Sequence, residues 1–99
     1  MPFHWNTANI EHIALHNVTP DEAEQVIEND PLDVDARICN GEMRTVHLGE
    51  TDASRVLFVV ITERDGMLRV VTAFEADRRA RRFYFDQKAI NDDQNTTDP

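Results

Sequence analysis

Cysteine, glycine and long apolar runs are all scarce in this chain of 99 residues. The only cysteine, Cys39, cannot form an internal disulfide, so a reducing compartment such as the cytoplasm is expected. The three glycines form neither a Gly-rich phosphate loop nor a Walker-type motif, which argues against a P-loop nucleotide-binding protein. No apolar stretch approaches the ~20 residues of a membrane-spanning helix, and no basic start precedes an apolar stretch. We therefore expect neither a membrane segment nor a signal peptide.

Basic residues are also few, and they are unevenly placed. Ten lysines and arginines face nineteen acidic residues, for a net charge of −9. Residues 1–54 hold eleven acidic and two basic residues, whereas residues 55–99 hold eight of each. Nucleic-acid binding depends on neutralising phosphates, so the whole chain is not expected to be a general nucleic-acid binder. A local arginine site and the attraction of a basic partner by the acidic half both remain open.

Turn residues and apolar periodicity divide the chain into seven predicted elements. Thr19-Pro20-Asp21-Glu22 is a capping box that opens a helix, and Asp65-Gly66 is typical of a type I′ hairpin turn. The predicted elements are helices over about 7–16 and 20–28, strands over 32–38, 43–48, 56–61 and 67–74, and a helix that begins after Asp77. This order predicts an α+β fold with two N-terminal helices, a four-stranded antiparallel sheet and a C-terminal helix.

The length favours one domain, predicted over residues 1–90, because a chain this short buries only a modest core. Residues 91–99 are polar and acidic and are predicted to be a disordered tail. The first predicted strand alternates cleanly and is expected at a sheet edge, with four apolar side chains on one side: Leu32, Val34, Ala36 and Ile38.

Four arginines crowd the first turns of the predicted last helix: Arg78, Arg79, Arg81 and Arg82. Cations at a helix N-terminus oppose the macrodipole, so local helix stability does not explain them. They are consistent with a phosphate or acidic-peptide site, and equally with a solvated face paired with the acidic half. Ala80, Phe83 and Tyr84 are expected to form the packed side of this helix.

A second charged group surrounds the predicted hairpin. Thr62 and Arg64 are expected on one side of their strand and Glu63 on the other. Glu63 has the chemistry of a general base, and Arg64 or Arg69 that of a group stabilising a phosphorane-like transition state. Composition alone favours the simpler interpretation, which is cross-strand charge pairing.

The histidines give no firm metal site. His12 and His16 are four residues apart, but a third ligand such as Cys39 or His47 is not required by any spacing, so no metal or cofactor is expected. His16 alone has the chemistry of a proton donor or acceptor near neutral pH.

Several short segments, in order, carry a resemblance to a known family. They are Trp5 and Asn9, His16-Asn17-Val18-Thr19 with Glu22-Ala23, Arg44 with Leu48-Gly49, residues 57–64, Arg69-Val70-Val71-Thr72-Ala73, Arg78-Arg79 and Tyr84. Over about residues 3–84 the chain resembles the BrnT family of type II toxins.

The resemblance implies a RelE-like fold and a metal-independent endoribonuclease that acts on RNA. It also implies neutralisation by a BrnA-like antitoxin, through which any contact with DNA would be indirect. The catalytic residues that it implies are His16, Glu63 and Arg64. The substrate-binding residues predicted with them are Thr62, Arg69, Arg78, Arg79 and Arg82.

Three positions depart from the family pattern. Leu15 stands where many members have lysine, and Phe74 stands where many have arginine. Asn17 replaces a glycine, and asparagine tolerates the left-handed conformation that is expected at this position after the first helix. The alternative is therefore a non-catalytic BrnT-like interaction module with an incomplete RNA site. A third hypothesis is an acidic partner-binding domain whose arginine helix docks on an acidic protein surface.

Overall fold

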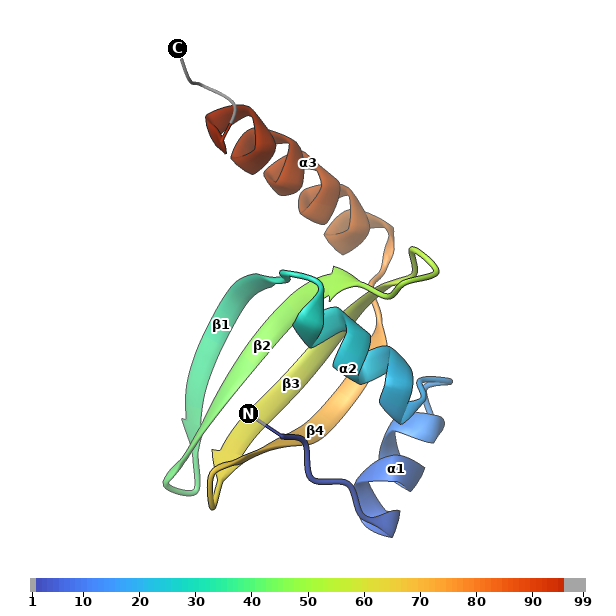
Figure 1. Ribbon diagram of the computed structural model, residues 1–99, viewed down its shortest axis with the longest axis vertical. Helices are drawn as coiled ribbons and strands as arrows, with labels where there is room; N and C mark the ends of the chain where they lie inside the picture. Colours follow the sequence, from blue (N-terminus) through green and yellow to red (C-terminus); the bar gives the residue numbers. More distant parts are fainter. Residues whose placement is uncertain (1, 96–99) are drawn as a thin grey trace.

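The computed structural model describes residues 2–95 and confirms the predicted α+β order. The elements are α1 (Thr7–Ala14), α2 (Pro20–Glu28), β1 (Leu32–Cys39), β2 (Glu42–Glu50), β3 (Val56–Arg64), β4 (Met67–Glu75) and α3 (Arg78–Asn95). Figure 1 shows α1 and α2 beside the sheet, while α3 projects past one of its ends. Within the described chain, none of the helices combines the length and apolar character of a membrane span.

Reciprocal side-chain caps begin both N-terminal helices. The backbone N–H of Asn9 donates to Asn6 Oδ1 at 3.0 Å, and that of Asn6 donates to Asn9 Oδ1 at 2.8 Å. The predicted capping box of Thr19 and Glu22 is confirmed at the start of α2. Helix α1 ends at Ala14, two residues before the predicted end, and Asn17 then takes the predicted left-handed conformation at φ 60°.

The sheet is a simple antiparallel meander in the order β1-β2-β3-β4. Asp65 and Gly66 have φ values of 56° and 75°, as a type I′ turn requires. Asn40 and Gly41 have similar φ values of 53° and 78°. Both hairpins therefore lie at one end of the sheet, and α3 lies at the other (Figure 1).

The predicted alternation of β1 is wrong in one respect. A register shift falls between Asp33 and Asp35, so Val34 has no direct partner. Leu32 pairs with Leu48 and Ala36 pairs with Thr45. Because Leu48 and Thr45 are an odd number of residues apart on β2, Leu32 and Ala36 lie on opposite faces. The strand is at the sheet edge, as predicted.

Helices α1 and α2 cover only one face of the sheet. The core between them is apolar and consists of Ile13, Val18, Ala23 and Val26 from the helical half with Leu57, Val59, Ile61, Val70 and Ala73 from β3 and β4. We call this side the covered face. The opposite side, which carries Arg44, Thr62 and Arg69 at one end and Phe58 and Phe74 at the other, is called the open face.

Helix α3 is attached mainly through Tyr84. Its ring is 1% exposed beside Leu48 and Val56, and its hydroxyl donates to Glu50 Oε1 at 3.1 Å. Burial, and then the charge of Glu50, raises the pKa of Tyr84 to about 12. Phe83, predicted on the packed side, is instead 47% exposed because the helix leaves the sheet.

The predicted tail boundary falls inside α3. The helix continues to Asn95, so residues 91–95 of the predicted tail are helical. Residues 96–99 lie outside the described residues.

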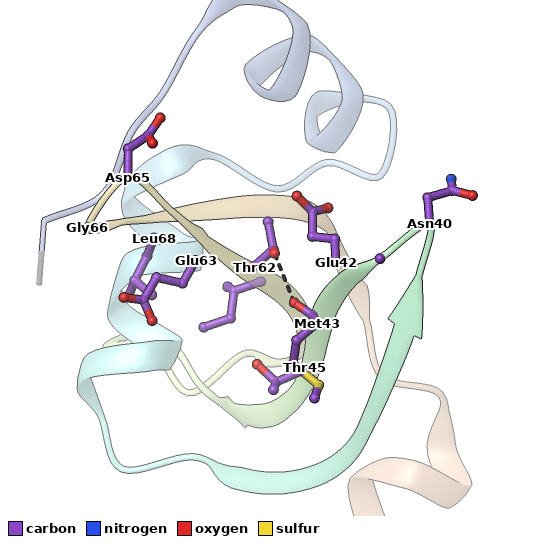
Figure 2. A pocket seen from close by; sticks show the side chains of 11 residues that line it. Asn40, Glu42, Met43, Thr45, Thr62, Glu63, Asp65, Gly66 and Leu68 are labelled. Atoms are coloured by element: carbon purple, nitrogen blue, oxygen red, sulfur yellow. Dashed lines mark hydrogen bonds between the residues drawn. The ribbon is translucent and has the colours of Figure 1, made fainter.

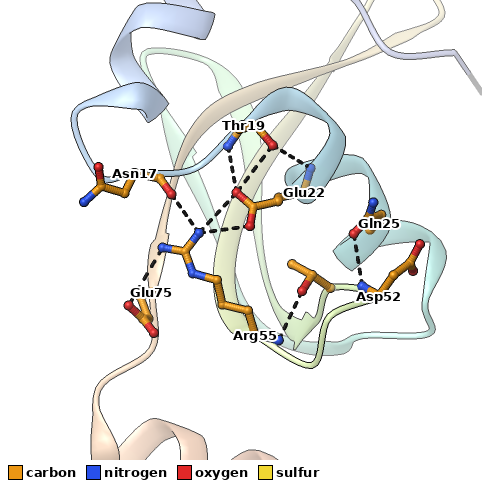
Figure 3. A network of polar contacts seen from close by, with 8 residues as sticks. Asn17, Thr19, Glu22, Gln25, Asp52, Arg55 and Glu75 are labelled. Atoms are coloured by element: carbon orange, nitrogen blue, oxygen red, sulfur yellow. Dashed lines mark hydrogen bonds and ion pairs between the residues drawn. The ribbon is translucent and has the colours of Figure 1, made fainter.

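One arginine joins three parts of the fold just before β3 begins. Arg55 Nη1 donates to the Asn17 carbonyl at 2.7 Å and to both Glu22 carboxylate oxygens at 3.1 Å (Figure 3). Its Nη2 lies 3.8 Å from Glu75 Oε1 on β4. Arg55 therefore fixes the end of α1 and the start of α2 against the sheet.

Candidate functional site

A row of arginines crosses the open face near the two hairpins. Arg37 pairs with Arg44, Arg44 with Thr62, and Thr62 with Arg69, so the four residues are in register across all four strands. Side chains that are directly opposite in an antiparallel sheet share a face and lie close together. The strand pairing therefore concentrates positive charge at one end of the open face.

Part of this row lines a small cavity, which we call the arginine pocket. Its volume is about 180 Å³, and its lining residues are Glu42, Arg44, Thr62, Arg64, Arg69, Val70 and Val71. Three guanidinium groups thus surround a space with only one carboxylate. Arginine offers a planar fork of donors that fits phosphate and carboxylate groups, so the pocket is suited to an oxyanion.

The single carboxylate only partly neutralises the pocket. Glu42 Oε2 accepts a hydrogen bond from Arg64 Nη2 at 2.7 Å, while Glu42 Oε1 lies 3.6 Å from Arg44 Nε. The Arg64 guanidinium lowers the pKa of the Glu42 carboxyl.

One guanidinium group of the pocket is unpaired and another is only loosely paired. Arg44 Nε is buried without a hydrogen-bond partner among the described residues, and its carboxylate neighbour, Glu42 Oε1, is 3.6 Å away. Within the same part of the chain, Arg69 forms no ion pair. Unused donors of this kind are what an incoming anion would bind.

Thr62 forms part of the floor of the pocket. It is 4% exposed, and its hydroxyl donates to the backbone carbonyl of Met43 at 2.9 Å. Its proton is therefore used to hold β2 and β3 together. The structure brings Thr62 and Arg69, which are predicted to bind substrate, together with Arg64, which is predicted to be catalytic.

Glu63 lies on the other face. It lines a neighbouring cavity of about 640 Å³ that also includes Ile61, Asp65 and Leu68 and shares Glu42 and Thr62 with the arginine pocket. Figure 2 shows Glu63 and Glu42 pointing to opposite sides of the sheet, as the strand alternation requires. No described residue lining this larger cavity is basic, so it is unsuited to a phosphate.

His16 follows α1 and lies beside Phe74 at the β4 edge of the sheet. Its ring centroid lies 6.1 Å from that of Phe74 on β4. Phe74 pairs with Phe58 and Arg69 pairs with Thr62, and these partners are four residues apart on β3, or about 13 Å at the usual rise. His16 therefore does not meet Arg64. In the part of the chain that is described, no group of three or more metal-ligating side chains is assembled.

The arginines of α3 form a separate group beyond the end of the sheet that is opposite the two hairpins (Figure 1). Arg79 lines an apolar cavity of about 410 Å³ with Val34, Leu48, Phe58, Asp77, Ala80 and Phe83. The predicted N-cap is confirmed, because the Ala80 N–H donates to Asp77 Oδ1 at 2.8 Å. The predicted set Arg78, Arg79 and Arg82 is thus on a different element from the arginine pocket.

Sequence reasoning missed the two β2 residues of the pocket as site residues. Glu42 was not considered, and Arg44 entered only as a carrier of the family resemblance. The signal that could have found them is the Asn40-Gly41 hairpin, which places both residues just after a tight turn. Their positions opposite Thr62 and Arg64 also depend on the pairing of β2 with β3, which local sequence does not specify.

Comparison with known proteins identifies the family of the chain. No curated protein matches the chain. A family profile described as “Ribonuclease toxin, BrnT, of type II toxin-antitoxin system” matches residues 5–80. That range covers α1, α2, the whole sheet and the beginning of α3. The chain therefore belongs to the BrnT family of ribonuclease toxins from type II toxin–antitoxin systems.

Proposed function

We propose that this protein is the toxin component of a type II toxin–antitoxin system and cleaves RNA internally without a metal ion. The observation that carries the proposal is the arginine pocket, in which three arginines surround an accessible space with a single carboxylate. A phosphodiester of single-stranded RNA fits that charge pattern. Membership of a ribonuclease toxin family supports this choice of anion.

The proposed chemistry is attack of the ribose 2′-oxygen on the adjacent phosphorus. The P–O5′ bond breaks, a 2′,3′-cyclic phosphate forms and the 5′-oxygen leaves. Arg44, Arg64 and Arg69 would stabilise the charge that builds on the phosphoryl oxygens in the transition state. The departing 5′-oxygen takes its proton from water.

Glu42 is the carboxylate in position to accept the 2′-hydroxyl proton. Its lowered pKa keeps it ionised at neutral pH but makes it a weak base. A bound phosphate would compete with Glu42 for the guanidinium group of Arg64. This competition would weaken the 2.7 Å hydrogen bond from Arg64 to Glu42, and Glu42 would become a stronger base. The catalytic roles of His16 and Glu63 stay predictions, and neither residue lines the arginine pocket.

The proposed partner is a BrnA-like antitoxin that covers the far end of the open face. The family implies an antitoxin. Helix α3 presents Phe83, Phe85 and Ile90, which are 47%, 40% and 48% exposed. With the apolar cavity between α3 and the sheet, they offer a surface on which an amphipathic segment can bury apolar area.

One observation favours the alternative of a non-catalytic interaction module. Phe74 is 37% exposed on the open face, where many family members carry an arginine. If that arginine contributes to cleavage elsewhere in the family, its charge is missing here. The experiment below separates the two functions directly.

The test is cleavage of a single-stranded oligoribonucleotide in the presence of EDTA, with the products examined for 2′,3′-cyclic phosphate ends. Arg44→Gln and Arg64→Gln each remove a transition-state donor, and each should lower the cleavage rate about 10²–10³-fold. Glu42→Gln should lower the rate while tightening RNA binding, because it frees Arg64. Arg81→Gln on α3 is the matched control and should cleave at the wild-type rate. Absence of cleavage by wild type, or equal rates in all variants, would contradict catalysis at this pocket.

A further inference from the structure

Four rings form a continuous ladder around the β4 edge of the sheet. The ring centroids of His12 and His16 are 5.9 Å apart, those of His16 and Phe74 are 6.1 Å apart, and those of Phe74 and Phe58 are 5.3 Å apart. The ladder begins on the last turn of α1, crosses the outer strand and ends on the open face. Edge-to-face contacts of this kind fix the ring orientations.

Phe74 is the ring of the ladder that is exposed on the open face. It is 37% exposed and belongs to neither of the two core clusters, whereas Phe58 packs against the cluster around Tyr84. The ring is thus supported by His16 on one side and Phe58 on the other, without being enclosed. An aromatic ring exposed on a sheet face is the kind of surface on which unpaired bases of single-stranded RNA stack.

The exposed ring and the arginine pocket lie on the same face of the sheet. Phe58 pairs with Phe74 at one end, and Thr62 pairs with Arg69 at the other. Between these rows lie Val46, Val60 and Thr72, in register and uncharged. The strand partners Phe58 and Thr62 are four residues apart on β3, so the two rows are about 13 Å apart, which a single strand of RNA covers in a few nucleotides.

We propose that Phe74, held between His16 and Phe58, is a stacking platform for an unpaired base of the RNA strand whose phosphate occupies the arginine pocket. The inference rests on the proposed function and adds a base-binding subsite to it. The strand would lie along the open face, with its charge bound at the hairpin end and a base bound at the ladder.

The test uses a single-stranded oligonucleotide that is 2′-O-methylated throughout, so that it binds without cleavage. Its dissociation constant is measured by fluorescence anisotropy, and a 2-aminopurine placed at successive positions reports stacking by quenching. Phe74→Leu removes the ring from an exposed site and should weaken binding at least about fivefold. It should also abolish the quenching. Phe74→Trp should restore both, while Phe85→Leu is the matched exposed-aromatic control and should bind like wild type.

Abasic substitution identifies the stacked base. At one position, loss of the base should weaken binding to wild type but not to Phe74→Leu, because the two changes remove the same contact. If Phe74→Leu unfolds, the abasic scan on wild type and Phe74→Trp decides the question. Uniform binding across that scan would overturn the proposal.

The outcomes separate this inference from the proposed function. If Arg64→Gln weakens binding while Phe74→Leu does not, the stacking subsite is overturned and the phosphate site stands. If binding depends on Phe74 but unmethylated RNA stays intact, the subsite is supported and catalysis is overturned. If wild type binds no RNA at low salt, both fall together.

Discussion

Arg55→Leu should strongly destabilise the fold, because one guanidinium group holds three chain segments together. Arg55 Nη1 donates to Asn17 and Glu22 at 2.7 and 3.1 Å, and the side chains of Arg55 and Glu22 are 24% and 27% exposed. A hydrogen bond to a charged group contributes about 1.5–3 kcal/mol, and partial exposure reduces that value. We expect a loss of about 2–3 kcal/mol in the free energy of unfolding, which corresponds to at least about 8 °C in Tm.

The dependence of this loss on pH gives a sharper check. Partial burial alone would raise the pKa of Glu22, but the Thr19 N–H and the Arg55 guanidinium lower it below 4.5. A lowered folded-state pKa contributes stability above the ordinary value, and that contribution disappears as the pH falls through the lowered one. The difference between wild type and Arg55→Leu should therefore be largest at neutral pH and shrink well below pH 4.5.

The assay is chemical denaturation followed by circular dichroism at several pH values. Glu22→Gln keeps the capping box but removes the charge, so the double variant with Arg55→Leu measures the coupling between the two residues. Arg37→Leu is the control, because Arg37 and its partner Asp35 are exposed, and its stability should match wild type. A wild-type Tm for Arg55→Leu, or the same loss at pH 3 and pH 7, would refute the reasoning.

Two further predictions concern packing and alkaline stability. The pKa of Tyr84 is raised to about 12. The protonated hydroxyl therefore stabilises the fold by about 2–3 kcal/mol below pH 10, and this stabilisation is lost as the pH rises toward 12. The free energy of unfolding of wild type should therefore decrease as the pH rises toward 12, whereas that of Tyr84→Phe, which cannot ionise, should decrease less. The same pH dependence in both proteins would contradict this. Gly49→Ala would place a Cβ 2.9 Å from the Pro31 Cβ, so the free energy of unfolding should decrease by about 1–3 kcal/mol, as measured by chemical denaturation. An unchanged denaturation midpoint would show that β2 and Pro31 can move apart without cost.

The elements and turns of this fold were largely predictable, because their signals are local. The capping box of Thr19 and Glu22, the positive φ of Asn17 and the Asp65-Gly66 hairpin each depend on a few neighbouring residues. The family resemblance is likewise carried by short motifs in order, and the match over residues 5–80 confirms it. Local chemistry therefore sufficed for element order and family.

The site was less predictable, because it depends on register between strands. Arg44 lies opposite Thr62 only because the loop before β3 has its particular length and shape, with the Thr51 N–H donating to the Arg55 carbonyl at 2.8 Å. A shift of two residues would keep Arg44 on the same face but give it another partner. The bulge at Val34 was likewise not predictable, since apolar and polar residues alternate along β1 without any sign of an extra residue.

The resemblance also grouped residues that the fold separates. His16, Glu63 and Arg64 were predicted together, yet they lie respectively beside Phe74, on the covered face and in the arginine pocket. A match between short sequence motifs carries no information on the distances between these three residues in the fold. The direction of Glu63 itself, opposite to that of Arg64, follows from strand alternation and was predicted.

An acidic chain can present an anion site because the sheet sorts neighbouring residues by face. Along β3, Arg64 turns to the open face and Glu63 to the covered face, although the two are adjacent in sequence. The acidic residues of α2 lie on the helix that packs against the covered face, away from the pocket, and Glu42 is the carboxylate that lines it. The net charge of −9 therefore describes the long-range field of the protein, while local arrangement decides what the open face binds. Such a protein gains little from general electrostatic attraction to RNA, so the RNA binding that we propose must come from close contacts, namely three guanidinium groups at one end of the face and a ring at the other.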